Sequence, residues 1–481
     1  MTPSLPARHG GQPKRDQGRL VIVSNRVPDP AKRGTQAGGL AVAVADALTP
    51  GSLWFGWSGK TARKTATHPQ IEEADGITYA TIDLGEQDHK RFYVGFANST
   101  LWPLLHFRLG LIDFKREDYA GYIRVNKAYA AALAPLLQPD DIVWIHDYHL
   151  IPLAAELRAL GVKNKLGFFL HVPFVPASVF AVLPPAKDLL RALCTYDVVG
   201  FQTDEHLNDF RNAVRRMLGA EIRQDGFINM VGVNCRAMVV PIGIDAQHFA
   251  QLAERATRSV ERRRMETSLA GRSLVIGVDR LDYSKGLPHR FRGFAKLLAN
   301  EPELRGRVHY LQIAAISREE VAEYQTLRRE LDHLAGNVNG RFGEVDWTPL
   351  RYMTRAVSRT ALAGLYRAAR IGLVTPLRDG MNLVAKEYVA AQDPADPGVL
   401  VLSQFAGAAE EMGDAALLVN PYDSEEIAEA ICQGLAMGLD ERRQRFEKLV
   451  ASVFTSTAEN YCRQFIAALT ADTESGKTIA L

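Results

Sequence analysis

Short apolar segments that alternate with longer helical stretches limit the folds open to this chain more than any other feature. Most of these segments are continuous apolar runs rather than alternating polar and apolar residues. Such runs are typical of strands in parallel sheets that are covered on both faces. Strands alternating with helices predict an α/β fold with right-handed crossovers. The predicted strands are Leu20–Ser24, Ile142–His146, Leu166–His171, Val198–Gln202, Met238–Pro241, Leu274–Val278, Val308–Ile313, Ile371–Thr375, Val399–Ser403 and Ala416–Val419.

The length of the chain divides these strands between two sheets. A chain of 481 residues exceeds one ordinary core, so we expect two domains of roughly 200–250 residues. The hinge is predicted at Pro241–Asp245, because a charged helical stretch follows it and a new strand begins at Leu274. Ligands of such proteins bind at the carboxyl ends of the strands, in the cleft between the domains. The predicted helices are Leu40–Leu48, Lys127–Leu137, Leu287–Asn300, Val321–Gly336 and Asn382–Gln392.

Composition argues against several classes of protein. The 57 basic and 55 acidic side chains give a net charge of +2, which offers no basis for a nucleic-acid partner. The four cysteines lack the spacing of zinc ligands, which predicts a reduced, metal-free chain. No apolar run approaches the ~20 residues that span a bilayer. Residues 1–18 lack the apolar core of a signal peptide and predict a disordered leader, so we expect a cytoplasmic protein without a membrane partner.

The segment from Val278 to Gly286 follows one predicted strand and precedes a helix. It carries Arg280 and Lys285 beside that helix N-terminus. Free backbone amides and the helix dipole favour anions there, and two cations would hold a diphosphate. Alternatively, both cations pair with Asp279 and Asp282 on the surface. When this loop is considered by itself, surface ion pairs are the favoured interpretation.

A second loop, Leu377–Asn382, follows the strand Ile371–Thr375. Gly380 permits close approach of backbone to a ligand, and the next residues open a helix. Glu387, one to two turns into that helix, suits hydrogen bonds to the vicinal hydroxyls of a ribose or sugar. An exposed helical glutamate is the alternative. Because both loops fall in the same half of the chain, each strengthens the functional interpretation of the other.

Missing motifs narrow the chemistry further. The chain has no G-x-G, which disfavours a nicotinamide dehydrogenase, and Gly38–Leu40 resembles a phosphate-binding turn only weakly. It also has no D-x-D, the acidic pair with which many metal-dependent transferases bind a nucleotide diphosphate. Leaving-group charge must then be neutralised by cations and helix ends, which points again to Arg280 and Lys285.

The N-terminal half offers candidate acceptor contacts. Arg26 follows the first strand, and Trp57 stands between glycines in a predicted loop, where an indole can stack on a sugar. Asp147 and His171 stand at strand ends. Each would individually be a core or structural residue, but together, opposite a donor-like loop, they suggest an acceptor site.

Four long strings resemble the trehalose-6-phosphate synthase family of retaining glycosyltransferases. They are Leu53–Gly59, Trp144–His149, Arg280–Gly286 and Thr375–Glu387, and the resemblance runs from about Arg19 to Phe465. The family has two Rossmann-like domains facing across a deep cleft, which is the GT-B arrangement. The resemblance implies transfer of glucose from a nucleoside diphosphate glucose, usually UDP-glucose, to glucose 6-phosphate, giving α,α-trehalose 6-phosphate.

The resemblance also implies a role for each site residue. Arg280, Lys285, His171 and Asp379 would be catalytic. The donor would contact Gly39, Arg280, Lys285, Asp379, Met381, Asn382, Leu383, Val384 and Glu387. The acceptor would contact Arg26, Trp57, Tyr93, Trp102, Asp147 and Arg318, with the phosphate held by Arg26, Tyr93, Trp102 and Arg318.

The same resemblance sets the remaining expectations. Residues 19–247 would form the acceptor-binding domain and residues 248–453 the nucleotide-sugar-binding domain. Residues 454–481 would form a C-terminal helix that packs back on the acceptor-binding domain. No cofactor or divalent metal would be required. We expect a homo-oligomer, a separate phosphatase acting on the product, and a part in trehalose biosynthesis and osmoprotection. A different phosphorylated acceptor, as in glucosylglycerol-phosphate synthases, a non-catalytic sugar-phosphate-sensing subunit and a nucleotide-sugar epimerase remain alternatives.

Overall fold

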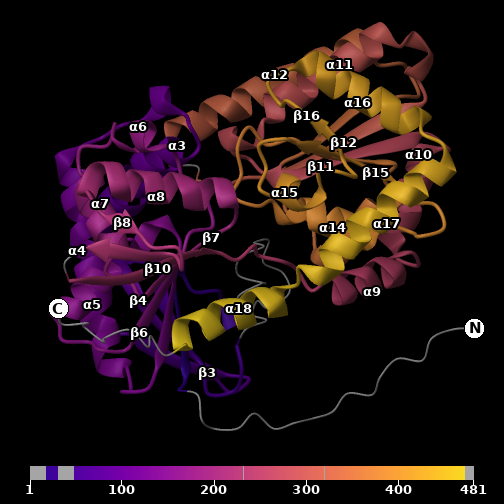
Figure 1. Ribbon diagram of the computed structural model, residues 1–481. Helices are drawn as coiled ribbons and strands as arrows, with labels where there is room; N and C mark the ends of the chain where they lie inside the picture. Colours follow the sequence, from indigo (N-terminus) through magenta and orange to yellow (C-terminus); the bar gives the residue numbers. More distant parts are fainter. Residues whose placement is uncertain (1–17, 31–47, 231, 319, 472–481) are drawn as a thin grey trace, which may run out of the picture.

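The protein consists of two α/β halves, each built on its own sheet (Figure 1). The computed structural model describes residues 18–30, 48–230, 232–318 and 320–471. The predicted leader (apart from Gly18), most of the predicted helix Leu40–Leu48, and Gly39 therefore lie outside the described residues. The α/β fold class predicted from the sequence is confirmed.

The N-terminal sheet has the strand order β3-β4-β2-β1-β5-β6-β7-β10-β9-β8. Its strands are β1 (Leu20–Arg26), β2 (Leu53–Ala62), β3 (Gln70–Ala74), β4 (Ile77–Gly85), β5 (Ile142–His146), β6 (Lys165–Phe169), β7 (Val198–Phe201), β8 (Glu221–Ile222), β9 (Phe227–Met230) and β10 (Val233–Val239). The central pairs are parallel, and antiparallel pairing occurs at the two ends, in β3–β4, β8–β9 and β9–β10.

The C-terminal sheet has the order β13-β12-β11-β14-β15-β16, and its neighbouring strands pair in parallel. Its strands are β11 (Ser273–Arg280), β12 (Val308–Ala315), β13 (Leu350–Met353), β14 (Ile371–Val374), β15 (Val399–Ser403) and β16 (Leu417–Val419). Parallel order brings the carboxyl ends of these strands to one edge, where the loops of interest begin.

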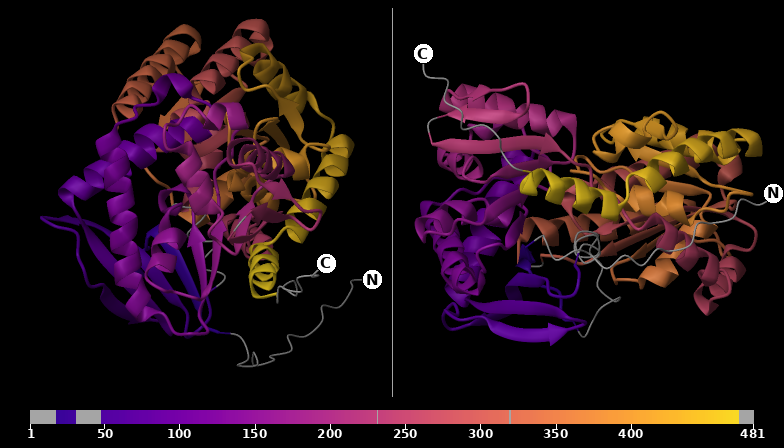
Figure 2. Two further views of the ribbon diagram at one scale, coloured as in Figure 1. Left: turned by 60° about the vertical axis from the view of Figure 1, so that its left-hand side comes forward. Right: turned by 60° about the horizontal axis from the view of Figure 1, so that its bottom comes forward.

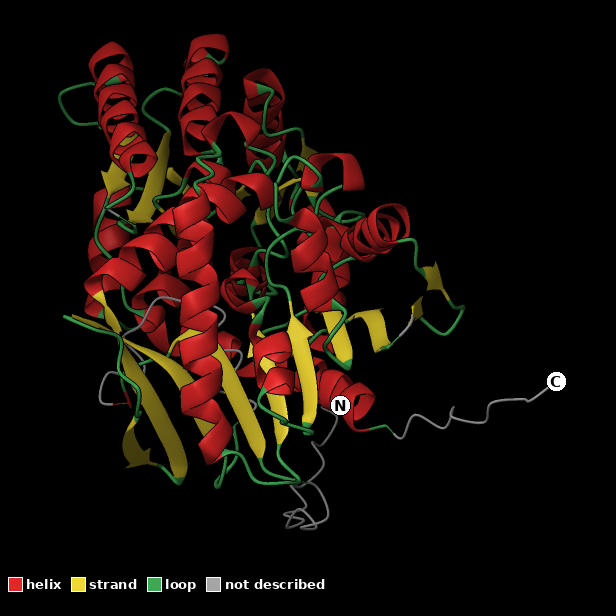
Figure 3. Cartoon of the chain, turned by 90° about the vertical axis from the view of Figure 1, so that its left-hand side faces the viewer, coloured by secondary structure: helices red, strands yellow, loops and turns green. Residues whose placement is uncertain are grey.

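Helices cover both sheets (Figure 2), and Figure 3 shows several of them in front of the N-terminal strands. In the N-terminal half they include a π-helical stretch (His89–Leu101), α2 (Glu86–Asp88), α3 (Trp102–Leu105), α4 (Arg116–Leu133), α5 (Leu153–Ala159), α6 (Ala177–Phe180), α7 (Ala186–Leu193) and α8 (Asp204–Leu218). The remainder are α9 (Ala246–Ala256), α10 (Val260–Leu269), α11 (Leu287–Asn300), α12 (Ala322–Phe342), α13 (Arg359–Ala368), α14 (Leu383–Ala391), α15 (Ala408–Met412), α16 (Ser424–Ala436), α17 (Leu439–Thr455) and α18 (Ala458–Thr470).

The continuous apolar runs are strands whose two faces are both buried. In β1, Val21 and Val23 belong to one hydrophobic cluster, whereas Ile22 belongs to another. In β5, Ile145 and Trp144 divide in the same way. Successive side chains of a strand point to opposite faces, so a strand with a core on each side is apolar throughout.

The chain crosses between the halves at two adjacent places. The first is the predicted hinge at Pro241–Asp245, and the second precedes α18, where Thr457 forms a parallel bridge with Ile244. A Cβ at Gly243 would lie 1.9 Å from the carbonyl oxygen of Ser456, so only glycine fits between the crossings.

After the second crossing, α18 returns to the N-terminal sheet, where it contacts β6 and β7 (Figure 1). Gly167 and Gly200 of these strands leave room for the ring of Phe465, since a Cβ at either position would lie under 3 Å from it. The last described helix therefore ties the end of the chain to its N-terminal half.

One local prediction from the sequence is wrong. The segment around Trp57, predicted as a loop, lies in strand β2, which pairs with β1 and β4. Its glycines suggested a turn, but a Cβ at Gly56 would meet the carbonyl oxygen of Ser24 at 2.2 Å. This glycine allows a close approach of neighbouring strands rather than a turn.

Candidate active site

A cavity of about 490 Å³ lies between the two halves, and strand-end loops from both sheets line it. Its wall contains side chains that follow β5, β6 and β7 in one half and β11, β12 and β14 in the other. The predicted site residues that line it are Tyr93, Trp102, Asp147, His171, Arg280, Lys285, Arg318, Asp379, Met381, Asn382, Leu383, Val384 and Glu387. The cavity lies where the sequence analysis predicted ligand binding, at the carboxyl ends of the strands and between the two halves.

The Arg280–Lys285 loop joins β11 to α11 by a tight turn. The Asp282 carboxylate accepts the N–H of Ser284 at 3.0 Å. Gly286 has a φ of +68° and approaches the carbonyl oxygen of Thr375 so closely that a Cβ would lie 2.6 Å from it. This geometry brings Arg280 and Lys285 to the same cavity wall.

The alternative of surface ion pairs within this loop is wrong. Asp279 instead pairs with the buried Arg290, at 2.5 Å. Asp282 pairs with Arg318, which comes from the loop after β12, at 3.1 Å. Within the described ranges Arg280 forms no ion pair, and its guanidinium carbon lies 5.5 Å from the Trp102 ring centroid. Asp279 and Asp282 are therefore paired with other arginines, and Arg280 can bind an anion.

Lys285 reaches across to the second predicted loop. Its Nζ lies 2.5 Å from Oδ2 of Asp379, which also accepts a hydrogen bond from Asn382 at 3.0 Å. Burial alone would raise the pKa of Asp379, but Lys285, together with His106 and Asn382, lowers it below its usual value. Asp379 is therefore a carboxylate that can accept hydrogen bonds from hydroxyl groups.

The Asp379–Asn382 turn also touches the opposite half. Gly380 lies so close to His171 that a Cβ would stand 2.0 Å from the His171 carbonyl oxygen. Asn382 has a φ of +82° and caps α14 without a side-chain bond to it. Among the described residues, the first amides of α14 therefore lack a side-chain partner, and they lie beside the cavity, as at other anion-binding helix ends.

Glu387 lines the cavity from α14, so the alternative of an exposed helical glutamate is wrong. Burial raises the pKa of its carboxyl to about 7, although Arg359 acts in the opposite direction. The charge of Glu387 is therefore sensitive to pH near neutrality.

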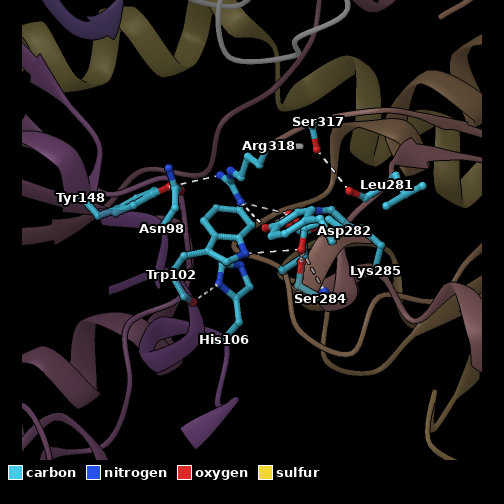
Figure 4. Close-up of polar contacts among 12 residues, drawn as sticks. Asn98, Trp102, His106, Tyr148, Leu281, Asp282, Ser284, Lys285, Ser317 and Arg318 are labelled. Atoms are coloured by element: carbon cyan, nitrogen blue, oxygen red, sulfur yellow. Dashed lines mark hydrogen bonds and ion pairs between the residues drawn. The ribbon is translucent and has the colours of Figure 1, made fainter. Parts of the chain in front are cut away.

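Arg318 links the two halves (Figure 4). Its guanidinium carbon lies 3.8 Å from the Trp102 ring centroid, and it donates hydrogen bonds to Asp282 and to Tyr148 Oη. Trp102 Nε1 also donates to Asp282, at 3.3 Å. Burial would raise the pKa of Asp282, but Arg318 and the neighbouring cations lower it to about 2. The cluster is charged and spans the cleft.

Asp147 and His171 lie beside each other on the N-terminal wall. Asp147 has a φ of +75°, an uncommon conformation for a residue with a side chain, and its Oδ1 accepts the His171 N–H at 3.3 Å. Burial raises the Asp147 pKa to about 6. Burial also lowers the pKa of His171 well below its usual range, which keeps the imidazole neutral.

Two predicted contacts, Trp57 and Arg26, are not among the described residues that line the cavity. Trp57 is buried behind Tyr93, with ring centroids 5.7 Å apart, and Arg26 lies 5.9 Å from the Trp57 ring. Gly39 lies outside the described residues. Sequence reasoning missed Gln202, Tyr148 and Arg359, which line the cavity. Gln202 ends a predicted strand, so the strand-end rule applied to it as well.

The described residues contain no group of three His, Cys, Asp or Glu side chains placed to hold a metal ion. None of their helices has both the length and the apolar composition that a membrane span requires.

Comparison with known protein families shows which family the chain belongs to. The model of glycosyltransferase family 20 matches residues 19–471, which is nearly all of the chain. The chain belongs to glycosyltransferase family 20. The sequence-based prediction of a glycosyltransferase related to trehalose-6-phosphate synthases is thereby confirmed.

Relatives within family 20 are similar over almost their whole length. A trehalose-6-phosphate synthase of Sinorhizobium fredii is 50% identical over 460 residues, covering 95% of this chain and 99% of that protein. The crystal structure of a UDP-forming α,α-trehalose-phosphate synthase from Burkholderia vietnamiensis superposes with a TM-score of 0.92 at 46% identity, covering 95% and 97% of the two chains.

A third relative was crystallised with a ligand. The UDP-forming enzyme of Burkholderia xenovorans, in complex with glucose-6-phosphate, gives a TM-score of 0.91 at 46% identity and covers 94% of this chain and 100% of that one. The GT-B arrangement predicted from the sequence, with two domains facing across a cleft, is confirmed by these family 20 structures and by the cavity between the two sheets.

Proposed function

We propose that this chain transfers glucose from UDP-glucose to glucose 6-phosphate with retention, giving α,α-trehalose 6-phosphate and UDP. The observation that carries the proposal is that cations from the ends of two different strands line the same cavity. Arg280 and Lys285 line it on one loop and Arg318 on another. Two phosphate-bearing substrates need two sets of cations. The relatives described above carry the matching activity in their names.

Donor binding is assigned to the half that spans residues 248–453. Arg280 and Lys285 would hold the diphosphate, with help from the free amides at Leu383 and Val384. Glu387 would accept hydrogen bonds from the ribose hydroxyls. Asp379, His171 and the backbone from Met381 to Leu383 would contact the transferred glucose, and Gly39 would approach it from the other half.

Acceptor binding is assigned to the half that spans residues 19–247, against which α18 packs. Arg318 with Tyr93 and Trp102 would hold the phosphate, and Asp147 would accept a hydrogen bond from the acceptor sugar. Trp57 and Arg26 would support this wall, because Trp57 packs directly against Tyr93. Since Arg318 comes from the opposite half, an acceptor phosphate would bridge the cleft and favour closure.

The chemistry follows from the charges. The acceptor hydroxyl oxygen forms a bond to the anomeric carbon while the bond from that carbon to the β-phosphate oxygen breaks, on the same face of the sugar. The proton passes to the departing β-phosphate. Arg280 and Lys285 stabilise the charge that develops there. The product keeps its phosphate ester, so a separate phosphatase would be needed to release the free disaccharide.

A substrate matrix tests the proposal. UDP-, ADP- and GDP-glucose are each combined with glucose 6-phosphate, glycerol 3-phosphate and fructose 6-phosphate, and both nucleotide release and product are measured. We expect the highest turnover with UDP-glucose and glucose 6-phosphate. Turnover with glycerol 3-phosphate alone would establish the glucosylglycerol-type alternative, and binding without turnover would indicate a sensing subunit. Each run repeated with EDTA tests the expectation that no divalent metal is required.

A further inference from the structure

The hinge peptide at Ile242 is held by a side chain from each half. Its N–H donates to Oε1 of Gln202 at 2.9 Å, and its carbonyl accepts from Nζ of Lys386 at 2.9 Å. Gln202 directly follows β7, whereas Lys386 lies on α14, next to Glu387. Both side chains are buried, and Lys386 also pairs with Glu411. The hinge peptide is therefore fixed to both domains at once.

The bond to Ile242 decides which end of Gln202 faces His171. A backbone N–H requires an acceptor, so the amide oxygen lies at the hinge and the amide nitrogen faces the imidazole. That nitrogen lies 3.4 Å from Nδ1 of His171. Because an amide nitrogen only donates, Nδ1 must be an unprotonated acceptor.

The other nitrogen of His171 completes the pattern. A neutral imidazole with an unprotonated Nδ1 carries its proton on Nε2, which lies 3.0 Å from Nδ1 of His146. His146 then holds its own proton on Nε2, a buried atom for which the described residues provide no partner. The bonds run in one direction, from Gln202 through His171 to His146.

The surroundings of His171 keep the ring neutral. The titratable groups that face it are His146 at the end of β5, Asp147 just after β5, and Tyr461 of α18, whose ring centroid lies 6.4 Å away. Burial lowers the pKa of both histidines, and that of His146 to about 3. A single tautomer of each ring is therefore consistent with the geometry.

We propose that Gln202 is a positioning residue that fixes the tautomer of His171 from the hinge peptide, which Lys386 holds from the donor-binding helix. The inference deepens the proposed function, because it rests on the assignment of His171 to the transferred glucose. Both ring nitrogens of His171 are then bonded within the protein, Nδ1 to Gln202 and Nε2 to His146, so the imidazole is held in one orientation on the cavity wall. Helix α14, through Lys386, and the His171 imidazole, through Gln202, are thus both connected to the Ile242 peptide.

The variant Gln202→Glu tests this role with little change in shape. The introduced carboxylate still accepts the Ile242 N–H, but its other oxygen can no longer donate to His171. We expect kcat at pH 8 to fall at least about tenfold, while the Kd for UDP stays within about twofold of wild type. As the pH falls towards 6, the buried carboxyl takes up a proton and regains an O–H donor. The ratio of variant kcat to wild-type kcat should therefore rise.

Gln392→Glu is the matched control. Gln392 is also buried, accepts a backbone N–H from Gly398 at 2.9 Å and donates to two carbonyls, but it does not line the cavity. Its variant measures what the same substitution does to folding, and we expect a lower Tm with a pH-independent kcat ratio. Wild-type kcat in Gln202→Glu at pH 8, or a ratio that does not change with pH, would overturn the proposal.

The wild-type protein provides a second measurement that does not depend on the variant's folding. In protein labelled with ¹⁵N-histidine, the signals lost in His171→Gln identify His171. We expect a protonated Nε2 and an unprotonated Nδ1, and the reverse would refute the inference. If the wild type binds UDP with this tautomer but transfers no glucose, the proposed function fails while the positioning role stands.

Discussion

At the scale of single residues, the site depends on which charges are already paired. Asp279 and Asp282 are held by Arg290 and Arg318, so they cannot neutralise Arg280. Lys285 is held in place by Asp379. These pairings orient the cations without cancelling the positive charge of the wall, which suits a doubly charged leaving group.

The substitution Lys285→Ala should lower kcat by roughly 10²–10³-fold, the cost of losing one electrostatic contact to a leaving group. Initial rates of UDP release measure it. Lys296→Ala is the control, because Lys296 is a partly exposed residue of α11 paired with Glu425 at the surface. Unchanged turnover in Lys285→Ala would contradict the role assigned to this lysine.

The raised pKa of Glu387 predicts a pH-dependent donor affinity. Below pH 7 the free protein must lose a proton from this carboxyl before a carboxylate can bind the ribose. UDP should therefore bind about tenfold more weakly at pH 6 than at pH 8. Titration calorimetry of Glu387→Gln corrects for protonation of UDP itself. An equally steep pH dependence in that variant would show that another group is responsible.

The residue-level site could be predicted from the sequence only in part. Arg280, Lys285 and Glu387 were found because strand ends point to the cleft. The partners of Asp279 and Asp282 could not be predicted, because Arg290 and Arg318 reach them through folding. Gln202 was missed because its amide gains a role only beside His171 and the hinge.

At the scale of elements, the helices and strands that were predicted well are those with long, uniform patterns. The bounds of α11 and β5 agree with the sequence analysis because their patterns are uninterrupted. Strand β2 was mistaken for a loop because its glycines serve contacts with neighbouring strands that no local pattern records.

The two chain crossings give a prediction at this scale. In Gly243→Ala the added methyl group would overlap Ser456, so we expect a loss of about 1–3 kcal/mol in the free energy of unfolding together with a lower kcat. Urea denaturation measures the first effect. Gly336→Ala, in the middle of α12 with no neighbour near the added methyl group, should be neutral or stabilising by up to about 1 kcal/mol. Equal stabilities of the two variants would argue against a tight crossing.

At the scale of the whole molecule, α18 joins the end of the chain to its beginning. Its Phe465 packs against Trp144, with ring centroids 4.6 Å apart, and against Phe169. The helix reaches the N-terminal sheet only after the chain has completed the C-terminal one. The expectation that residues 454–481 pack on the first half came from the family resemblance, because no local pattern in this segment specifies its packing partner.

Phe465→Ala should therefore destabilise the N-terminal half by about 3–5 kcal/mol, because it leaves a void beside Gly167 and Gly200. Phe454→Ala, at an exposed position on α17, is the control and should change stability by less than about 1 kcal/mol. Thermal unfolding compares the two. Similar Tm values would mean that α18 adds little to the sheet.

The central claim is that this cavity joins two glucose units through their anomeric carbons with retention at the donor. Proton NMR of the product formed from UDP-glucose and glucose 6-phosphate tests it most directly. The account predicts a phosphorylated disaccharide in which both anomeric protons are α, formed in equal amount to UDP. A product with a β-configured glucose from the donor, or UDP release without any disaccharide, would contradict it.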